Sequence, residues 1–246
     1  MSLDHKVAEV AALLARIESE YSPAVFASSF GAEDMVLTHL IASRRANIRI
    51  VTLDTGRLPK ETLELMQRSR RELDFRLATY VPIAEIVDDF VARNGQNPFY
   101  DSVDMRKRCC YIRKVEPLNR ALVGARAWLT GMRREQAASR GALEVEERDA
   151  DRGIAKFNPL ADWSSDEVWA YLRQHDVPYN ALHDRGYPSI GCEPCTRAVQ
   201  PGEDPRAGRW WWERDAEGKK ECGLHISVVS TAGLRHKEEF SEEVSA

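Results

Sequence analysis

Hydrophobic and polar residues in the N-terminal third of the chain alternate between a helical and a strand-like pattern. Apolar residues recur at helical spacing over 3–21, which predicts an amphipathic first helix. The short apolar run 24–27 has the length of a strand, and residues 33–42 predict a helix after it. A second strand is predicted over 48–53 and a further helix over 59–73, with a proline near its first turn.

The same alternation continues through the middle of the chain. Residues 77–81 predict a strand, and 83–93 predict a helix. A longer helix is predicted over 105–122, with Pro117 kinking or splitting it, and 127–130 predict another strand. Strands that alternate with helices indicate a mostly parallel sheet with helices on both faces. The predicted fold class is therefore α/β with a doubly wound sheet.

The last part of the chain has fewer regular patterns. Residues 140–153 are charged and lack clear periodicity, so we predict a loop there. A helix is predicted to follow Ser165 as its N-cap and to reach about Gln174. We interpret Trp163 and Trp169 as core residues.

Composition restricts the class of protein. The 246 residues suffice for one α/β domain with a full core, and 43% hydrophobic with 30% charged residues is typical of a soluble globular protein. No apolar run approaches the roughly 18 residues that a membrane span needs, and the start MSLDHK is unlike a signal peptide. A net charge of −4 argues against general nucleic-acid binding. We expect a cytoplasmic protein that binds neither membrane nor nucleic acid.

Four of the five cysteines have the pattern of metal ligands. In a reducing compartment, cysteines more often bind metal or react than form disulfides. Cys109 and Cys110 are adjacent, which strains a disulfide between them, and Cys192 and Cys195 form a C-x-x-C pair. Four thiolates are the usual complement of a 4Fe-4S cluster or a structural zinc. Zinc usually draws on two C-x₂₋₄-C hairpins, so the adjacent pair favours iron-sulfur and leaves zinc as the alternative.

The fifth cysteine, Cys222, has the surroundings of a nucleophile. It lies beside Lys219 and Lys220 and three residues before His225. Positive neighbours lower the pKa of a thiol and increase the fraction present as the attacking thiolate. An inert structural cysteine is expected among apolar residues, whereas this stretch is polar. We therefore predict a reactive Cys222.

Basic residues form three islands in this acidic chain. Such islands suggest a small anionic ligand or cluster, although any single charge run is more often a solvated helix face. The islands consist of Arg106, Lys107, Arg108, Arg113 and Lys114; of Arg133, Arg134 and Arg140; and of Arg206 and Arg209.

Two loops follow predicted strands where a doubly wound sheet binds ligands. The first, 28–31, has the sequence Ser-Ser-Phe-Gly and precedes a helix, a place where backbone N–H groups bind phosphate-like anions. Taken alone it is better explained as an ordinary strand-to-helix turn, and it is not a P-loop because the G-K-[ST] ending is missing. The second loop, 54–57, has the sequence Asp-Thr-Gly-Arg.

Taken together, these motifs resemble those of a known family. The set consists of CC, C-x-x-C after 81 intervening residues, and ECGLH, joined by SSFGAED, LDTGR, TGMRREQAASR and RAGRWWWE. It is similar to that of the assimilatory adenylyl-sulfate (APS) reductases, relatives of the phosphoadenylyl-sulfate (PAPS) reductases. The resemblance covers about residues 25–226, and the first loop resembles the modified PP-loop of adenine nucleotide alpha hydrolase-like proteins.

The resemblance implies a reaction and its catalytic residues. A 4Fe-4S cluster would be bound by Cys109, Cys110, Cys192 and Cys195. Cys222 would attack the sulfate sulfur of APS, form a Cys S-sulfonate and release AMP, in assimilatory sulfate reduction and cysteine biosynthesis. Thioredoxin or a glutaredoxin-like reductant would then free sulfite. The implied catalytic residues are Cys222, His225 and Lys114, where Lys114 links the cluster to the substrate site.

The resemblance also implies how the substrate is held. Both loops would contribute, together with arginines whose guanidinium groups suit bidentate contacts to sulfate and phosphate oxygens. The implied substrate-binding residues are Ser28, Ser29, Phe30, Gly31, Asp54, Thr55, Gly56, Arg57, Arg133, Arg134, Arg140, Arg206 and Arg209.

The chain is expected to divide into a nucleotide-binding domain with the cluster, 1–218, and a mobile C-terminal segment with the catalytic cysteine, 219–246. By analogy we expect a homo-oligomer. APS is preferred over PAPS because PAPS-specific relatives lack the CC and C-x-x-C pairs.

Two other classes compete with this interpretation. A PP-loop tRNA-thiolating enzyme should have S-G-G-x-D-S at the first loop, where this chain has S-F-G-A-E-D. A non-catalytic iron-sulfur sensor would leave the first loop and ECGLH without a purpose.

Overall fold

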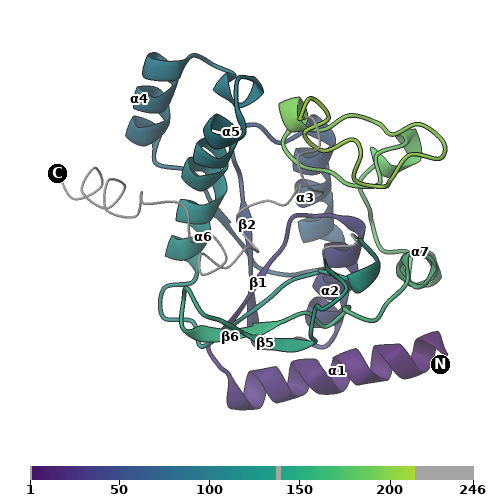
Figure 1. Cartoon of the computed structure of the whole chain (residues 1–246). Helices are drawn as coiled ribbons and strands as arrows, with labels where there is room; N and C mark the ends of the chain where they lie inside the picture. Colours follow the sequence, from purple (N-terminus) through teal and green to yellow (C-terminus); the bar gives the residue numbers. More distant parts are fainter. Residues whose placement is uncertain (1, 137–139, 214–246) are drawn as a thin grey trace.

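The computed structural model describes residues 2–136 and 140–213 (Figure 1). Its centre is a six-stranded sheet in the order β3-β2-β1-β4-β6-β5. All neighbouring strands are parallel except for the edge pair β5 and β6. The predicted α/β class with a doubly wound, mostly parallel sheet is thereby confirmed. The strands are β1 Ala24–Ala27, β2 Ile48–Leu53, β3 Leu77–Tyr80, β4 Ala127–Leu129, β5 Glu146–Asp149 and β6 Ile154–Phe157.

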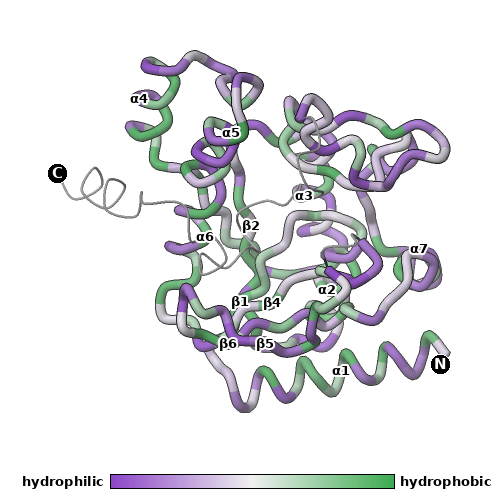
Figure 2. Tube along the Cα trace, viewed as in Figure 1, coloured by the Kyte–Doolittle hydropathy of each residue, from purple (hydrophilic) through white to green (hydrophobic). Residues whose placement is uncertain are grey.

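The helices lie close to their predicted positions. The first helix, α1, is amphipathic as predicted, and hydrophobic and hydrophilic stretches alternate along it in Figure 2. No helix in the described part of the chain has the length and apolar character needed to cross a membrane. The helices are α1 Leu3–Glu20, α2 Ala32–Ser43, α3 Lys60–Glu72, α4 Ala84–Asn94, α5 Val103–Cys110, α6 Glu116–Ala121 and α7 Ser165–Gln174.

Both faces of the sheet are buried, each in its own hydrophobic core. Because the side chains of a strand alternate between its two faces, neighbouring residues of one strand pack into different cores. In β1, Phe26 packs into the larger core with α1, α2, α3 and α7, whereas Val25 packs into a second core with Leu118 of α6. In β4, Leu129 faces the larger core and Trp128 the smaller one. This two-sided burial explains why β1 and β4 are continuous apolar runs in the sequence.

The long helix predicted over 105–122 is split, as Pro117 led us to expect. A wide π-type turn, Tyr111–Val115, separates α5 from α6, and the Glu116 N–H donates to the Tyr111 carbonyl. A proline lacks an N–H, and its ring collides with the carbonyl four residues earlier, which a widened turn relieves. The distortion begins directly after Cys110, where two adjacent thiols must be brought to one site.

The prediction of a loop over 140–153 was wrong. Residues 146–149 form the edge strand β5, which pairs with β6 from Glu146 opposite Phe157 to Asp149 opposite Ile154. An edge strand needs no apolar alternation, because backbone pairing on one side holds it and charged side chains protect its free edge. The prediction also missed β6, whose four residues are interrupted by a lysine.

Helix α7 begins one residue earlier than predicted. Its N-cap is Ser164, not Ser165, and the Ser164 hydroxyl accepts from the Glu167 N–H while the Glu167 carboxylate accepts from the Ser164 N–H. This reciprocal capping box satisfies two N–H groups that the helix itself leaves unbonded. Trp163 is buried as expected, and Trp169 is only partly buried at the rim of the core.

We expect Ser164→Ala to lower the free energy of unfolding by about 1 kcal/mol, because the Glu167 N–H loses its acceptor. For a chain of this size the midpoint of thermal unfolding should fall by about 2–4 °C. Circular dichroism during heating measures the change. The matched control is Ser165→Ala, at an exposed position inside the same helix, and an equal fall in both variants would contradict the assignment.

Candidate active site

The strand order changes direction between β1 and β4, and we call the region between the loops that follow these two strands the crevice. The loop after β1, 28–31, and the residues after β4, 130–133, both leave the sheet at the carboxyl ends of their strands. Doubly wound sheets bind ligands at this point. Phe30 is buried with a φ of 60°, a left-handed conformation that non-glycine residues seldom adopt. Strain of this kind is often found at ligand-binding loops.

Asp34, in the first turn of α2, joins the two sides of this crevice. Its carboxylate accepts from the Ser29 N–H at 2.5 Å and from the Ser29 hydroxyl at 2.7 Å. It also accepts from the Gly131 N–H on the other side. Burial raises the pKa of Asp34 to about 6, against the lowering effect of these hydrogen bonds. The two loops are therefore connected through one buried carboxyl group.

Three arginines of the second basic island lie beside this crevice, with protein partners. Arg133 is buried and donates to Glu33 at 2.8 Å from Nε and also forms an ion pair with Glu135. Arg140 is buried and donates to the side-chain oxygen of Gln136, whereas Arg134 is more exposed and pairs with Asp162. The acidic partners, and Asp34, were not predicted as site residues. Glu33 and Asp34 are the acidic pair of the SSFGAED motif, the one signal that would have indicated them.

The second loop, 54–57, leaves the carboxyl end of β2 and contacts the segment that contains Cys192. The Thr55 Oγ1 lies 3.3 Å from the Cys192 Sγ, and the Arg57 carbonyl accepts from the Glu193 N–H at 2.8 Å. Gly56 has a φ of 69°, which suits glycine at this turn, and its N–H donates to the Asp54 carboxylate.

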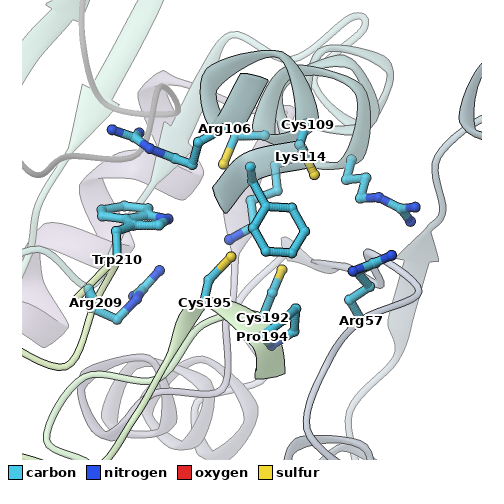
Figure 3. Close-up of a pocket in the computed structure, with 12 residues that line it drawn as sticks. Arg57, Arg106, Cys109, Lys114, Cys192, Pro194, Cys195, Arg209 and Trp210 are labelled. Carbon is cyan, nitrogen blue, oxygen red and sulfur yellow. The ribbon is translucent and has the colours of Figure 1, made fainter. Parts of the chain in front are cut away.

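All four predicted metal ligands line one pocket. Three of them, Cys109, Cys192 and Cys195, are seen around the pocket in Figure 3, and Cys110 lines it too. Cys109 and Cys110 come from the end of α5, and the other two from the 3₁₀ turn Glu193–Cys195 and the residue before it. The pocket thus joins segments more than eighty residues apart in sequence.

Cations surround this pocket. Five basic side chains line it, from three separate segments of the chain. They are Arg57, Arg106, Arg113, Lys114 and Arg209. Burial raises the pKa of Cys195 to about 12, with a smaller opposing effect from Lys114. Burial also raises the pKa of Cys109, with the largest opposing effect from Arg113. Thiols in such surroundings ionise when a metal binds them.

Trp210 forms one wall of the pocket between two guanidinium groups. The Arg106 Cζ lies 4.5 Å and the Arg209 Cζ 4.8 Å from the centre of its ring, on either side (Figure 3). The indole Nε1 of Trp210 and the Nε of Arg209 are buried with no hydrogen-bond partner among the described residues. Buried donors of this kind usually have a partner.

Arg106 connects the pocket to the end of the described chain. It donates to the Glu213 carboxylate from Nε at 2.7 Å and from Nη2 at 3.0 Å. Both side chains are almost fully buried, with 3% and 9% exposed. Arg106 was noted as part of a basic island but not predicted as a site residue, and nothing near it in the sequence indicates its distant partner.

The pocket fits an anionic group held by thiolates. It offers four sulfur ligands, five cations and two unpartnered donors. Among the described residues, no three Cys, His, Asp or Glu side chains come close enough to hold one metal ion. Four cysteines and five cations around one pocket fit a metal centre that is held by thiolates.

The structure thus divides the predicted site residues into two groups. The loops after β1 and β4 and the residues that follow them carry Ser28, Ser29, Phe30, Gly31, Arg133, Arg134 and Arg140. The cysteine pocket is lined by Lys114, Arg57, Arg209 and the four cysteines, and Asp54, Thr55 and Gly56 belong to the loop that contacts Cys192. Arg209 lies against Gly191, where an added Cβ would be 2.3 Å from its Nη2. Arg206 is half-buried, and its N–H donates to Asp204. Cys222 and His225 lie outside the described residues, as does the expected domain boundary at 218.

Comparisons with known proteins agree on one family. Residues 23–198 match the phosphoadenosine phosphosulfate reductase domain. The chain is 56% identical to an adenosine 5'-phosphosulfate reductase of Burkholderia cepacia, over 92% of this chain and 89% of that one. It is also 56% identical to the enzyme of that name from Allochromatium vinosum, over 87% of this chain and 82% of that one.

Two solved structures show the same fold. The PAPS reductase of Candida auris, in a phosphate complex, has a TM-score of 0.67 and 28% identity, over 81% of this chain and 98% of that one. The yeast FAD synthetase has a TM-score of 0.54 and 17% identity, over 80% of this chain and 67% of that one. At that identity the second likeness concerns the fold alone.

Proposed function

The chain belongs to the phosphoadenosine phosphosulfate reductase family, and we propose that its substrate is APS, which it reduces to sulfite and AMP in sulfate assimilation. The observation that carries this proposal is 56% identity to adenosine 5'-phosphosulfate reductases over nearly the whole chain. The expectation of an APS reductase rather than a PAPS reductase is confirmed by these relatives. The expected adenine nucleotide alpha hydrolase-like fold is likewise confirmed by the solved structures.

In this proposal the nucleotide lies in the crevice and its phosphosulfate points toward the cysteine pocket. Loop 28–31 offers backbone N–H groups at the start of α2, where an anion is favoured. Loop 54–57 follows β2, the strand next to β1, and contacts Cys192 and Glu193. In the proposal this loop therefore lies between the nucleotide and the cysteine pocket. We propose that the arginines predicted from the sequence exchange their protein partners for phosphate and sulfate oxygens, with Arg209 at the pocket end.

The chemistry we propose proceeds by two displacements at sulfur. The Cys222 thiolate attacks the sulfate sulfur, an S–S bond forms, and the bond from sulfur to the phosphate-bridging oxygen breaks, so AMP leaves with that oxygen. A dithiol protein of the thioredoxin or glutaredoxin kind then attacks the Cys222 sulfur, and sulfite leaves with the bonding electron pair. Its second thiol resolves the mixed disulfide, so the dithiol supplies both electrons.

We further propose that Cys109, Cys110, Cys192 and Cys195 hold a 4Fe-4S cluster. Support comes from the four sulfurs, the cations and the unpartnered Trp210 and Arg209 donors around one pocket. When bound, the cluster supplies negative charge and a structural anchor, and the displacement chemistry above needs no change in its oxidation state. We propose that Lys114, which lines the same pocket as Cys195, orients the substrate anion relative to this charge.

Protein purified without oxygen should be brown, with four irons and matching labile sulfide per chain. Metal analysis and the visible absorption spectrum measure this. One zinc per chain in a colourless and fully active protein would contradict the cluster and favour the structural-zinc alternative.

The substrate is tested by the rate of thioredoxin-dependent sulfite release. We expect a higher kcat/KM for APS than for PAPS, and the reverse order would overturn the choice of substrate. No sulfite from either nucleotide, together with sulfur transfer to tRNA, would favour the tRNA-thiolating class instead. We also propose a cytoplasmic location, because the cysteines have the sequence pattern of metal ligands and a nucleophile rather than of a disulfide framework. A homo-oligomer remains our expectation by analogy, which the molar mass in solution would check.

A further inference from the structure

We propose that Asp34 is a positioning residue whose carboxylate holds the two sides of the nucleotide crevice at the spacing that APS needs. This inference rests on the proposed function, since it concerns the same substrate. Asp34 would not touch the reacting atoms. It would act through Ser29 on one side and Gly131 on the other.

The geometry fits such a connection. One carboxylate oxygen accepts from both the N–H and the hydroxyl of Ser29, which fixes the loop after β1. The Gly131 N–H donates to the same carboxylate from the loop after β4. These loops come from strands about one hundred residues apart, and the crevice lies between them.

Gly131 shows how closely the two loops approach. A Cβ there would lie 2.2 Å from the Asp34 Oδ1 and 3.2 Å from the Asp34 backbone nitrogen. Only glycine leaves room for this contact, because every other residue carries a Cβ. The close approach places the Asp34 carboxylate at the junction of both loops, with only 7% of the residue exposed.

The charges around Asp34 do not favour its ionised form strongly. Glu33 of the same helix raises its pKa, and Arg133, from the loop after β4, is already bound to Glu33. His183, from the 3₁₀ turn His183–Arg185, lies near Glu33 as well, and burial lowers the pKa of this histidine. The anion is thus held mainly by the Ser29 and Gly131 donors that it positions.

An ionised Asp34 should reduce the stability of the fold. Its pKa rises from 3.8 to about 6 on burial, so the folded protein binds the proton more tightly than the unfolded chain does. The stabilising effect of that proton is fully present below about pH 3.8 and is lost as the pH rises through about 6. At neutral pH the ionised Asp34 carboxylate therefore lowers the stability of the fold. Residues that are needed for function often have such a cost in stability.

A purely structural role predicts the opposite. Asp34 lies in the first turn of α2, where an acidic side chain stabilises a helix through its hydrogen bonds and the helix dipole. If that were its main role, an uncharged substitute would lower the melting temperature. The two roles therefore differ in the sign of the expected stability change.

The test is Asp34→Asn in the full-length, cluster-loaded protein. Asparagine keeps the shape and one acceptor oxygen for Ser29, but it loses the hydrogen bond from Gly131 and the buried negative charge. We expect KM for APS to rise at least about 10-fold, the effect of one lost hydrogen bond to a charged group, with a smaller change in kcat. The melting temperature at pH 8 should stay the same or rise. A fall in melting temperature, a failure to fold, or an unchanged KM would overturn the proposal.

The matched control is Asp149→Asn. Asp149 is also buried, and it also accepts from a backbone N–H, that of Arg152, but it lies at the β5–β6 hairpin at one edge of the sheet, away from the crevice. It forms an ion pair with Arg152 at 2.7 Å. We expect this variant to have a lower melting temperature with an unchanged KM. Equal KM changes in both variants would count against a specific role of Asp34.

A pH series gives a second readout. APS binding is measured by calorimetry in the Cys222→Ser background, where no turnover consumes the ligand. Affinity should fall as the pH drops from about 7.5 to about 5.5 with Asp34 present, because the carboxylate takes up a proton in that range, and this fall should be much smaller once the Asp34→Asn change is added. The same pH dependence in both would overturn the proposal. Absence of APS reduction by the unsubstituted protein would instead overturn the proposed function, and nucleotide binding would still test Asp34.

Discussion

Replacing Cys222 with serine is expected to abolish APS reduction while leaving the protein folded and brown. A serine hydroxyl is not ionised at neutral pH, so the attacking thiolate is lost. Turnover should fall by roughly 10⁴-fold or more, the scale seen when a covalent nucleophile is removed. The variant should still bind APS, because Cys222 is separate in the sequence from the residues that form the crevice and the cysteine pocket.

Mass spectrometry of protein incubated with APS and no reductant measures the intermediate. The unsubstituted protein should gain the mass of one SO₃ group on the peptide that contains Cys222, and Cys222→Ser should gain none. Ser227→Ala, in the same segment, is the matched control and should form the adduct. An adduct on any other cysteine would show that the nucleophile has been assigned wrongly.

The second large effect is expected for Cys195→Ser. This change removes one of the four proposed sulfur ligands from a pocket that five cations line and where three of the four cysteines are buried. The protein should lose its colour and most of its iron, and reduction of APS should fall to the background rate. Iron content, the absorption spectrum and sulfite release measure the three changes on the same sample.

Cys222→Ser serves as the control for this experiment, since it should retain all four irons. The comparison therefore separates loss of the nucleophile from loss of the cluster. A Cys195→Ser protein that keeps four irons would contradict the ligand assignment. A Cys222→Ser protein without iron would show that the fifth cysteine is also a ligand.

The central sheet could be predicted from the sequence because both of its faces are buried. Strand β1 was located correctly from its apolar run, and β2 from a mostly apolar stretch that includes Arg49 and Thr52. Strand β5 was missed because its charged residues carry no hydrophobic signal, and only pairing with β6 makes it a strand. Its existence depends on a neighbour in space, which a local pattern does not report.

Prediction of the site from the sequence has the same limit, because it detects local patterns and not contacts between distant residues. The spacing of the cysteines indicated one four-ligand site, and the structure brings all four to one pocket. The roles of Asp34 and Arg106 were not predicted, because each depends on partners far away in the sequence, Gly131 and Glu213. Buried carboxylates and ion pairs of this kind have no sequence pattern of their own until the fold is known.

The buried pair of Arg106 and Glu213 has a consequence for the kinetics of the first displacement. It fixes the point at the wall of the cysteine pocket from which the rest of the chain continues. Nine positions separate Glu213 from Cys222, and such a length reaches at most about 30 Å. One thiol confined to a sphere of that radius has an effective concentration on the order of 10 mM, whatever the protein concentration. In the proposed mechanism the attack of Cys222 on APS is therefore intramolecular, and a free thiol in solution would match its rate only at a concentration on the order of 10 mM.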